Sequence, residues 1–260
     1  DFRLPFTNNT NNTNTYVDRY MLKIGKGFEY VRPLLINNRK RWEFKGVLHE
    51  FLSNIDVVNT PDITIQGNYY IESGRSGNRS QNPTKYYDDA IILQNAYETE
   101  LALPDKGLSG RYAFYCARSY KDAGEKYHDK AIEWYKKVLD RQDHWHQEKY
   151  YSALEIGIIY KDKNQMDLAV QYLLKTLEYD IERIEGLITQ TVLVGLTQGQ
   201  YDALCLLIYD IGAKDFQSSI GFRRLHRNAL YDNVAFEFFL KGKNSKSAES
   251  KIAIEWWNEN

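Results

Sequence analysis

Two stretches decide the fold of this chain: Phe114-Tyr115-Cys116-Ala117-Arg118-Ser119-Tyr120-Lys121-Asp122 and, further on, Ala153-Leu154-Glu155-Ile156-Gly157-Ile158-Ile159-Tyr160-Lys161-Asp162. Both end in Tyr-Lys-Asp, at a spacing of 40 residues, and each is followed by an alanine, Ala131 or Ala169, at a spacing of 38. Small residues let paired helices approach, and this spacing is close to the tetratricopeptide period of about 34 residues. A fainter third unit runs over 187–211. The pattern predicts tetratricopeptide-like helical repeats.

The helical pattern begins at Pro83, which fits the first turn of a helix because its missing N–H is not needed there. Before it, residues 17–24, 28–36 and 41–47 are rich in aromatic and β-branched residues, and residues 37–40 supply a polar turn. We therefore expect a hairpin over 28–47, and a further strand over 63–71. The predicted fold class is α+β, with a β-rich domain at 1–82 and helical repeats at 83–260.

Composition limits the classes of function. The chain has 260 residues, 43% of them hydrophobic, a formal charge of −1 and a pI near 6.6, so it can bury a core and lacks the basic excess of a nucleic-acid binder. No apolar run is long enough to span a bilayer. Cys116 and Cys205 lie in apolar helical patterns, which is typical of reduced core thiols and predicts a cytoplasmic protein.

The stretch Trp42-Glu43-Phe44-Lys45-Gly46-Val47-Leu48-His49-Glu50 places an imidazole beside a carboxylate after the expected hairpin. Such a pair can perform acid/base or metal chemistry, although a surface turn is the commoner setting for it. A basic loop follows at 74–80, where Arg79 could bind an anion or only be solvated. The stretch His144-Trp145-His146 has ligand types but is better explained as a junction between repeats.

Four motifs occur in a family-like order. They resemble family 2 glycosyltransferases that carry a tetratricopeptide-like C-terminal region, and the resemblance covers residues 1–157. The motifs are Arg-Pro-Leu-Leu-Ile at 32–36, Trp-x-x-x-Gly-x-x-His-Glu at 42–50, Gly-x-Arg-Ser-x-x-Pro-x-Lys-Tyr-x-x-Asp-Ala at 77–90, and Arg-Tyr-x-Phe-Tyr-x-Ala-x-Ser-Tyr-x-Asp at 111–122. The resemblance implies the C-terminal part of a GT-A domain that lacks its nucleotide-sugar-binding half and its Asp-x-Asp motif.

The resemblance also implies roles for individual residues. Glu50 would be the base that takes the proton of an acceptor hydroxyl, and His49 would be a ligand of a divalent metal, Mn²⁺ or Mg²⁺, expected in the complete enzyme. Trp42 would form an apolar wall for a sugar, while Arg79 and Lys85 would neutralise the diphosphate. Weaker candidates for that loop are Arg75 and Ser80.

The resemblance thus implies an inverting transfer from a nucleotide sugar to a glycan or protein acceptor, and an inactive isolated chain. The alternative is a non-catalytic tetratricopeptide-like module that binds a protein partner in the concave groove of its repeats. An upstream coding sequence that ends in Asp-x-Asp would favour the enzyme.

Overall fold

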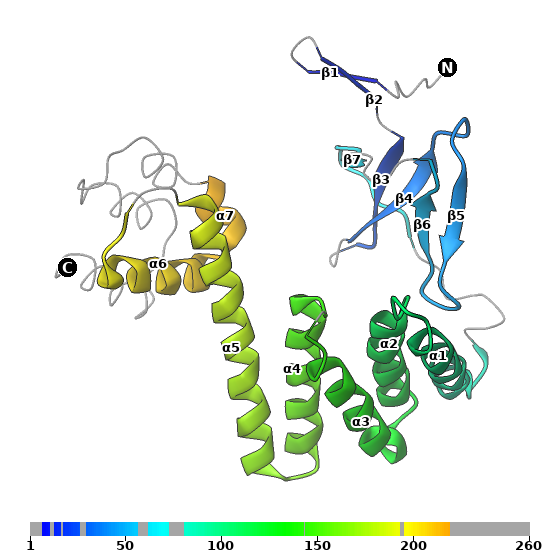
Figure 1. Ribbon diagram of the computed structural model, residues 1–260, viewed down its shortest axis with the longest axis vertical. Coiled ribbons are helices and arrows are strands. Elements are labelled where there is room, and N and C mark those ends of the chain that lie inside the picture. Colours follow the sequence, from blue (N-terminus) through cyan, green and yellow to red (C-terminus); the bar gives the residue numbers. More distant parts are fainter. Residues whose placement is uncertain are drawn as a thin grey trace. The chain divides into compact units, whose positions relative to one another are not determined.

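The computed structural model describes residues 7–10, 13–16, 18–26, 30–56, 62–72, 81–142, 144–192 and 195–218. The chain divides into two compact units, Asp1–Trp134 and Tyr135–Asn260. Short strands come first and helices follow, so the fold is α+β with a mostly helical remainder (Figure 1). Among the described residues, the last strand ends at Thr64 and the first α-helix begins at Lys85.

The described part of the first unit contains three small sheets. The largest has the order β4-β3-β7, in which β3 pairs antiparallel with β4 and parallel with β7. A second sheet joins β5 to β6, and a third joins β1 to β2. The strands are β1 (Thr7–Thr10), β2 (Thr13–Tyr16), β3 (Arg19–Ile24), β4 (Tyr30–Ile36), β5 (Trp42–Lys45), β6 (Phe51–Asn54) and β7 (Asp62–Thr64).

The predicted hairpin over 28–47 is wrong. The strand β4 pairs with β3, whereas β5 pairs with β6 through a turn that contains His49 and Glu50. The turn at 37–40 does form, because the N–H of Lys40 donates to the carbonyl of Asn37 over 3.1 Å, but it connects two different sheets. Strand propensity located these strands without specifying their partners.

Helices α1 (Lys85–Leu101) and α2 (Ser109–Asp122) form the helical core of the first unit. Tyr112, Cys116 and Tyr120 of α2 recur every fourth residue and are buried, so one face of the helix packs inward. The thiol of Cys116 donates to the carbonyl of Ala90 on α1 over 3.5 Å, and Ala90 and Leu93 of that helix are fully buried. A short 3₁₀ helix, η2 (Glu125–Tyr127), leads into α3 (His128–Leu139), where the two units divide.

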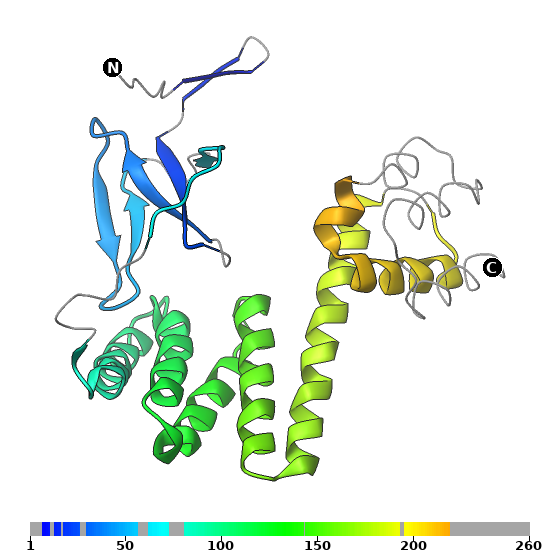
Figure 2. The same ribbon diagram turned by 180° about the vertical axis from the view of Figure 1, so that it is seen from behind.

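The second unit is helical throughout its described part. Figures 1 and 2 show α4 (His146–Asp162) and α5 (Met166–Thr191) side by side as an antiparallel pair. Helix α6 (Gln198–Ile211) begins with a capping box between Thr197 and Gln200, and α7 (Ala213–Ser218) follows it. Together, α5, α6 and α7 enclose a cluster of buried residues: Ile184, Ile188, Ala203, Leu204, Leu207, Ile208 and Phe216.

The sequence repeat corresponds to matching places in the helices. Both Tyr-Lys-Asp triplets lie at the C-terminal ends of helices, α2 and α4, and both alanines are buried near the starts of later helices, α3 and α5. Both cysteines are free thiols within helices. Among the described helices, none is long and apolar enough to cross a membrane.

Candidate functional site

The turn that carries His49 and Glu50 is held against helix α2. Within it, Gly46 and His49 adopt left-handed backbone angles, with φ of 111° and 52°. The backbone N–H of Val47 donates to the hydroxyl of Tyr112 over 3.2 Å, and Arg111 donates to the carbonyl of His49 over 2.7 Å. A left-handed histidine is uncommon, and these two anchors over-determine its position.

The predicted site residues do not all meet. His49 and Glu50 line one cavity of about 460 Å³, whereas the indole N–H of Trp42 donates to the carbonyl of Asn37 over 2.9 Å. Lys85 lies 3.2 Å from the carboxylate of Asp89 in its own helix. Residues 73–80, which include Arg75, Arg79 and Ser80, lie outside the described residues. The described part of the chain contains no cluster of three or more metal-ligating side chains.

The imidazole of His49 lies in a strongly positive environment. Its ring stacks on Tyr115 with the centroids 3.9 Å apart. Desolvation by burial, together with the charges of Arg118 and Arg111, lowers the pKa of His49 from 6.5 to about 4. The imidazole is therefore neutral at pH 7.

We expect this histidine to make folding depend on pH. Because the pKa is 6.5 in the unfolded chain and about 4 in the folded one, the unfolded chain binds the extra proton between these values. The contribution is fully present above pH 6.5 and is lost as the pH falls toward 4. Urea denaturation across this range measures it. The His49→Asn variant, which tolerates the left-handed backbone, should show a smaller slope of stability against pH; an unchanged slope would contradict the assignment to His49.

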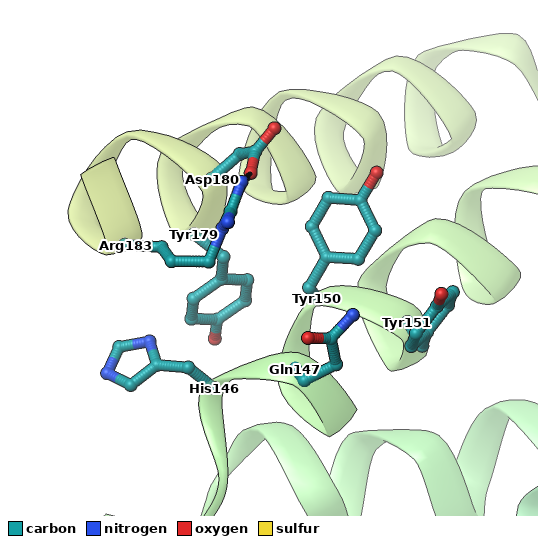
Figure 3. Close-up of a pocket in the computed structure, with 7 residues that line it drawn as sticks. All are labelled: His146, Gln147, Tyr150, Tyr151, Tyr179, Asp180 and Arg183. Atoms are coloured by element: carbon teal, nitrogen blue, oxygen red, sulfur yellow. Dashed lines mark hydrogen bonds and ion pairs between the residues drawn. The ribbon is translucent and has the colours of Figure 1, made fainter. Parts of the chain in front are cut away.

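A second candidate site lies between α4 and α5. The pocket, of about 290 Å³, is lined by His146, Gln147, Tyr150, Tyr151, Tyr179, Asp180 and Arg183. Figure 3 shows Tyr179 between His146 and Tyr150, with its hydroxyl directed toward α4. Burial raises the pKa values of Tyr150 and Tyr179, so both hydroxyls remain protonated donors near neutral pH. We call this site the tyrosine pocket.

Charged groups surround the tyrosine pocket. Arg183 donates to one oxygen of Asp180 through Nε and Nη2, over 3.2 and 2.8 Å. At the start of α4, Nδ1 of His146 lies 3.7 Å from the carboxylate of Glu182. His146 and Arg183 also line an adjoining hollow of about 400 Å³. The adjoining hollow is more apolar, because Ile184 and Leu187 of α5 and Ala213 of α7 contribute to its wall.

His144, the other histidine of the predicted junction, differs from His146. Nε2 of His144 lies 2.7 Å from the carboxylate of Glu148, and both side chains are buried. Trp145, between the two histidines, is 67% exposed. The sequence prediction of a partly exposed junction therefore fits Trp145 and His146 but not His144.

A third hollow, of about 480 Å³, lies between α5 and α6. Its walls are mainly apolar, from Leu177, Ile181, Ile184 and Leu206, and Glu185 and Asp202 lie at its edge. Burial, with the charges of Glu185 and Asp202, raises the pKa of Cys205 to about 11, so this thiol is not an activated nucleophile.

Comparison with known proteins points to the helical part of the chain. A family model described as phage lysozyme matches residues 156–251. The endolysin of Salmonella phage P22 is 38% identical over 73 residues, which are 28% of this chain and 49% of the endolysin. The chain therefore spans about half the length of this curated relative. No solved structure matches.

These similarities contradict the predicted family 2 glycosyltransferase, including its GT-A domain, inverting sugar transfer and nucleotide-sugar partner. They do not favour the non-catalytic binding module either. All four motifs of that prediction end by Asp122, whereas the family match begins at residue 156, where the sequence had indicated only general helical repeats. The glycosyltransferase prediction rested on motifs outside the matched residues, and helical periodicity within 156–251 does not identify a family. From residue 156 to residue 251, the chain is similar to phage lysozymes.

Proposed function

We propose that this protein acts on bacterial peptidoglycan as a lysozyme-type glycoside hydrolase, and that the tyrosine pocket binds the glycan. The observation that carries the proposal is the phage lysozyme match at residues 156–251, which includes Tyr179, Asp180 and Arg183. The identity to an endolysin supports it.

The chemistry of the tyrosine pocket suits a sugar chain. Aromatic rings such as Tyr150 and Tyr179 offer flat apolar surfaces to the C–H faces of sugars. Around them, Gln147 and Asp180 supply hydrogen-bonding groups for hydroxyl and acetamido substituents. Because Arg183 neutralises Asp180, the pocket favours a largely uncharged glycan over a small ion.

Cleavage of a glycosidic bond requires two carboxyl groups that flank it. The proposal therefore has two separable parts, glycan binding by the tyrosine pocket and hydrolysis by the protein as a whole. Binding is measured by co-sedimentation with purified peptidoglycan sacculi, and hydrolysis by the release of reducing ends from the same material.

We expect Tyr179→Ala to weaken binding to sacculi about tenfold, because an aromatic contact of about 0.5–1.5 kcal/mol is lost together with its buried area. The matched control is Tyr86→Ala, which removes a tyrosine that is 41% exposed on α1, outside the pocket, and should bind as the parent does. Equal binding by both variants would reject the tyrosine pocket as the glycan site. A parent chain that neither sediments with sacculi nor releases reducing ends would reject the proposed function itself.

We further propose that the sequence unit seen in α2–α3 and α4–α5 is a tetratricopeptide-like repeat that precedes and overlaps the lysozyme-like region. Support comes from the matching helix-end triplets and from Ala131 and Ala169, which are 0% and 2% exposed. A chain that ends after α5, and so keeps both of these sequence units whole, should then retain the helical signal of α1 to α5 by circular dichroism, because each repeat contacts mainly its neighbours. The domain division at 82/83 and the cytoplasmic location remain predictions.

A further inference from the structure

The cavity beside His49 in the first unit has the size and lining of a small-molecule site. Its volume of about 460 Å³ lies in the range of ligand pockets. Strands β3 and β4, the β5–β6 hairpin and helix α2 all contribute side chains to it. Most of its wall is apolar or aromatic, from Met21, Pro33, Leu34, Phe44, Phe51 and Tyr115.

One cation that lines this cavity, Arg111, has no carboxylate partner among the described residues. The centre of its guanidinium lies 4.8 Å from the ring centroid of Tyr115 and 5.3 Å from that of Phe51. Its Nη2 donates to the carbonyl of His49 over 2.7 Å, while its Nε is buried and has no hydrogen-bond partner among the described residues. A buried N–H that lacks a partner is costly, and the guanidinium that lines the cavity keeps its positive charge without a carboxylate partner in any described segment.

The remaining charges leave the cavity positive. Arg19 is neutralised by Asp62, whose two carboxylate oxygens accept from Nε and Nη2 over 2.7 and 3.0 Å. Arg32 lies over the ring of Tyr30 and has no carboxylate partner in the described part of the chain. Glu50 is exposed at the rim. Because the charges of Arg19 and Asp62 balance each other, the charged groups that remain in the cavity are the guanidinium groups of Arg32 and Arg111 and the carboxylate of Glu50.

We propose that this cavity binds a small organic anion, whose carboxylate or phosphate oxygens pair with Arg111 while its apolar body lies against Phe51 and the neighbouring apolar wall. A guanidinium that is held against two rings and tied to a backbone carbonyl is pre-organised to pair with an oxyanion. The apolar wall selects an anion with a hydrophobic body over an inorganic ion. This site lies outside the lysozyme-like residues 156–251, and the inference does not depend on the proposed function.

Isothermal titration of the full chain at low ionic strength tests the proposal with phenyl phosphate, benzoate and the neutral benzyl alcohol. Both anions should bind more tightly than the alcohol, and their ranking distinguishes a phosphate site from a carboxylate site. Arg111→Gln should weaken anion binding by about tenfold to a hundredfold, since hydrogen bonds to charged groups contribute strongly. The control is Arg41→Gln, which removes an arginine that pairs with Asp56 and lies outside the cavity; it should leave binding unchanged.

A second variant separates binding from loss of fold. Glu50→Gln removes the negative charge at the rim and should strengthen anion binding by about two- to fivefold, with the gain shrinking at high salt. A gain of affinity cannot arise from unfolding. The proposal fails if the parent binds the two anions no better than benzyl alcohol, or if Arg111→Gln, still folded by circular dichroism, binds them as the parent does. It also fails if Glu50→Gln does not strengthen binding.

Discussion

Leu207→Ala is expected to destabilise the second unit by about 2–5 kcal/mol, the usual cost of removing most of a buried leucine from a packed core. Leu207 is 0% exposed and lies on α6 within the cluster that joins α5, α6 and α7. Phe216, also 0% exposed, is part of the same cluster. The substitution would therefore leave an empty space among residues that are already close-packed. The loss should appear as faster hydrogen exchange of the α6 amides and as a lower urea midpoint.

The matched control for this change is Leu174→Ala. Leu174 is 56% exposed on α5, so the same substitution should change stability by no more than about 0.5 kcal/mol. Similar losses from both substitutions would mean that the cluster around Leu207 is not the core of this unit.

Helix periodicity was the strongest signal in the sequence, and it located most of the helices well. Tyr112, Cys116 and Tyr120 illustrate this signal: they recur every fourth residue and are buried on one face of α2, because that spacing places them on one side of a helix. Periodicity does not identify the partner of that face. A helix pair in a repeat and a helix pair in a lysozyme-like region therefore looked alike, and the third repeat expected at 187–211 spans the end of α5 and all of α6.

A local signal was present at the start of α6, within the third repeat expected at 187–211. Thr197 and Gln200 form a reciprocal capping box, over 3.2 and 3.1 Å, which starts α6 sharply after the break that follows Thr191. The spacing of Thr and Gln by three residues is readable from sequence. It indicates a helix start, but it says nothing about the family to which the helix belongs.

Pairing between strands was harder to predict than their position. The two strands of the expected hairpin, β4 and β5, lie close to the predicted ranges, yet they belong to different sheets. Residue-type preferences report only whether a segment fits a pleated surface. Register and partner depend on contacts such as the bidentate pair between Arg19 and Asp62, 43 residues apart, which no local pattern encodes.

For the candidate sites, too, the sequence indicated some of the residues but not how they come together in the fold. The sequence singled out His49 and Glu50, and both line one cavity. It missed Arg111 as a site residue, although this arginine stood in a quoted motif, because its isolation between two rings exists only after folding. The tyrosine pocket was also missed: the abundance of tyrosine suggested spare aromatic surface, but not that Tyr150 and Tyr179 of different helices meet in one hollow.

Gly157→Val should also lower the stability of the chain, because α4 packs closely against α5 at this residue. A β-carbon at Gly157 would lie 2.9 Å from Cγ of Leu173 and 3.3 Å from the carbonyl oxygen of Ala169. The Leu173 side chain can shift, since it is 38% exposed, but the Ala169 carbonyl belongs to the first turn of α5 and cannot move without the helix. We expect a loss of about 1–3 kcal/mol, typical of overpacking, in urea denaturation.

Gly186→Val is the matched control, because a β-carbon at Gly186 on α5 would meet nothing within 4 Å. Valine has a better helix propensity than glycine, so this variant should gain a few tenths of a kcal/mol. The two glycine variants also test the proposed function. Tyr150 on α4 and Tyr179 on α5 form the tyrosine pocket only while the two helices stay together. Gly157→Val should therefore weaken binding to peptidoglycan along with stability, whereas Gly186→Val should not. Undiminished glycan binding by a destabilised Gly157→Val chain would separate the pocket from the helix pair that is proposed to build it.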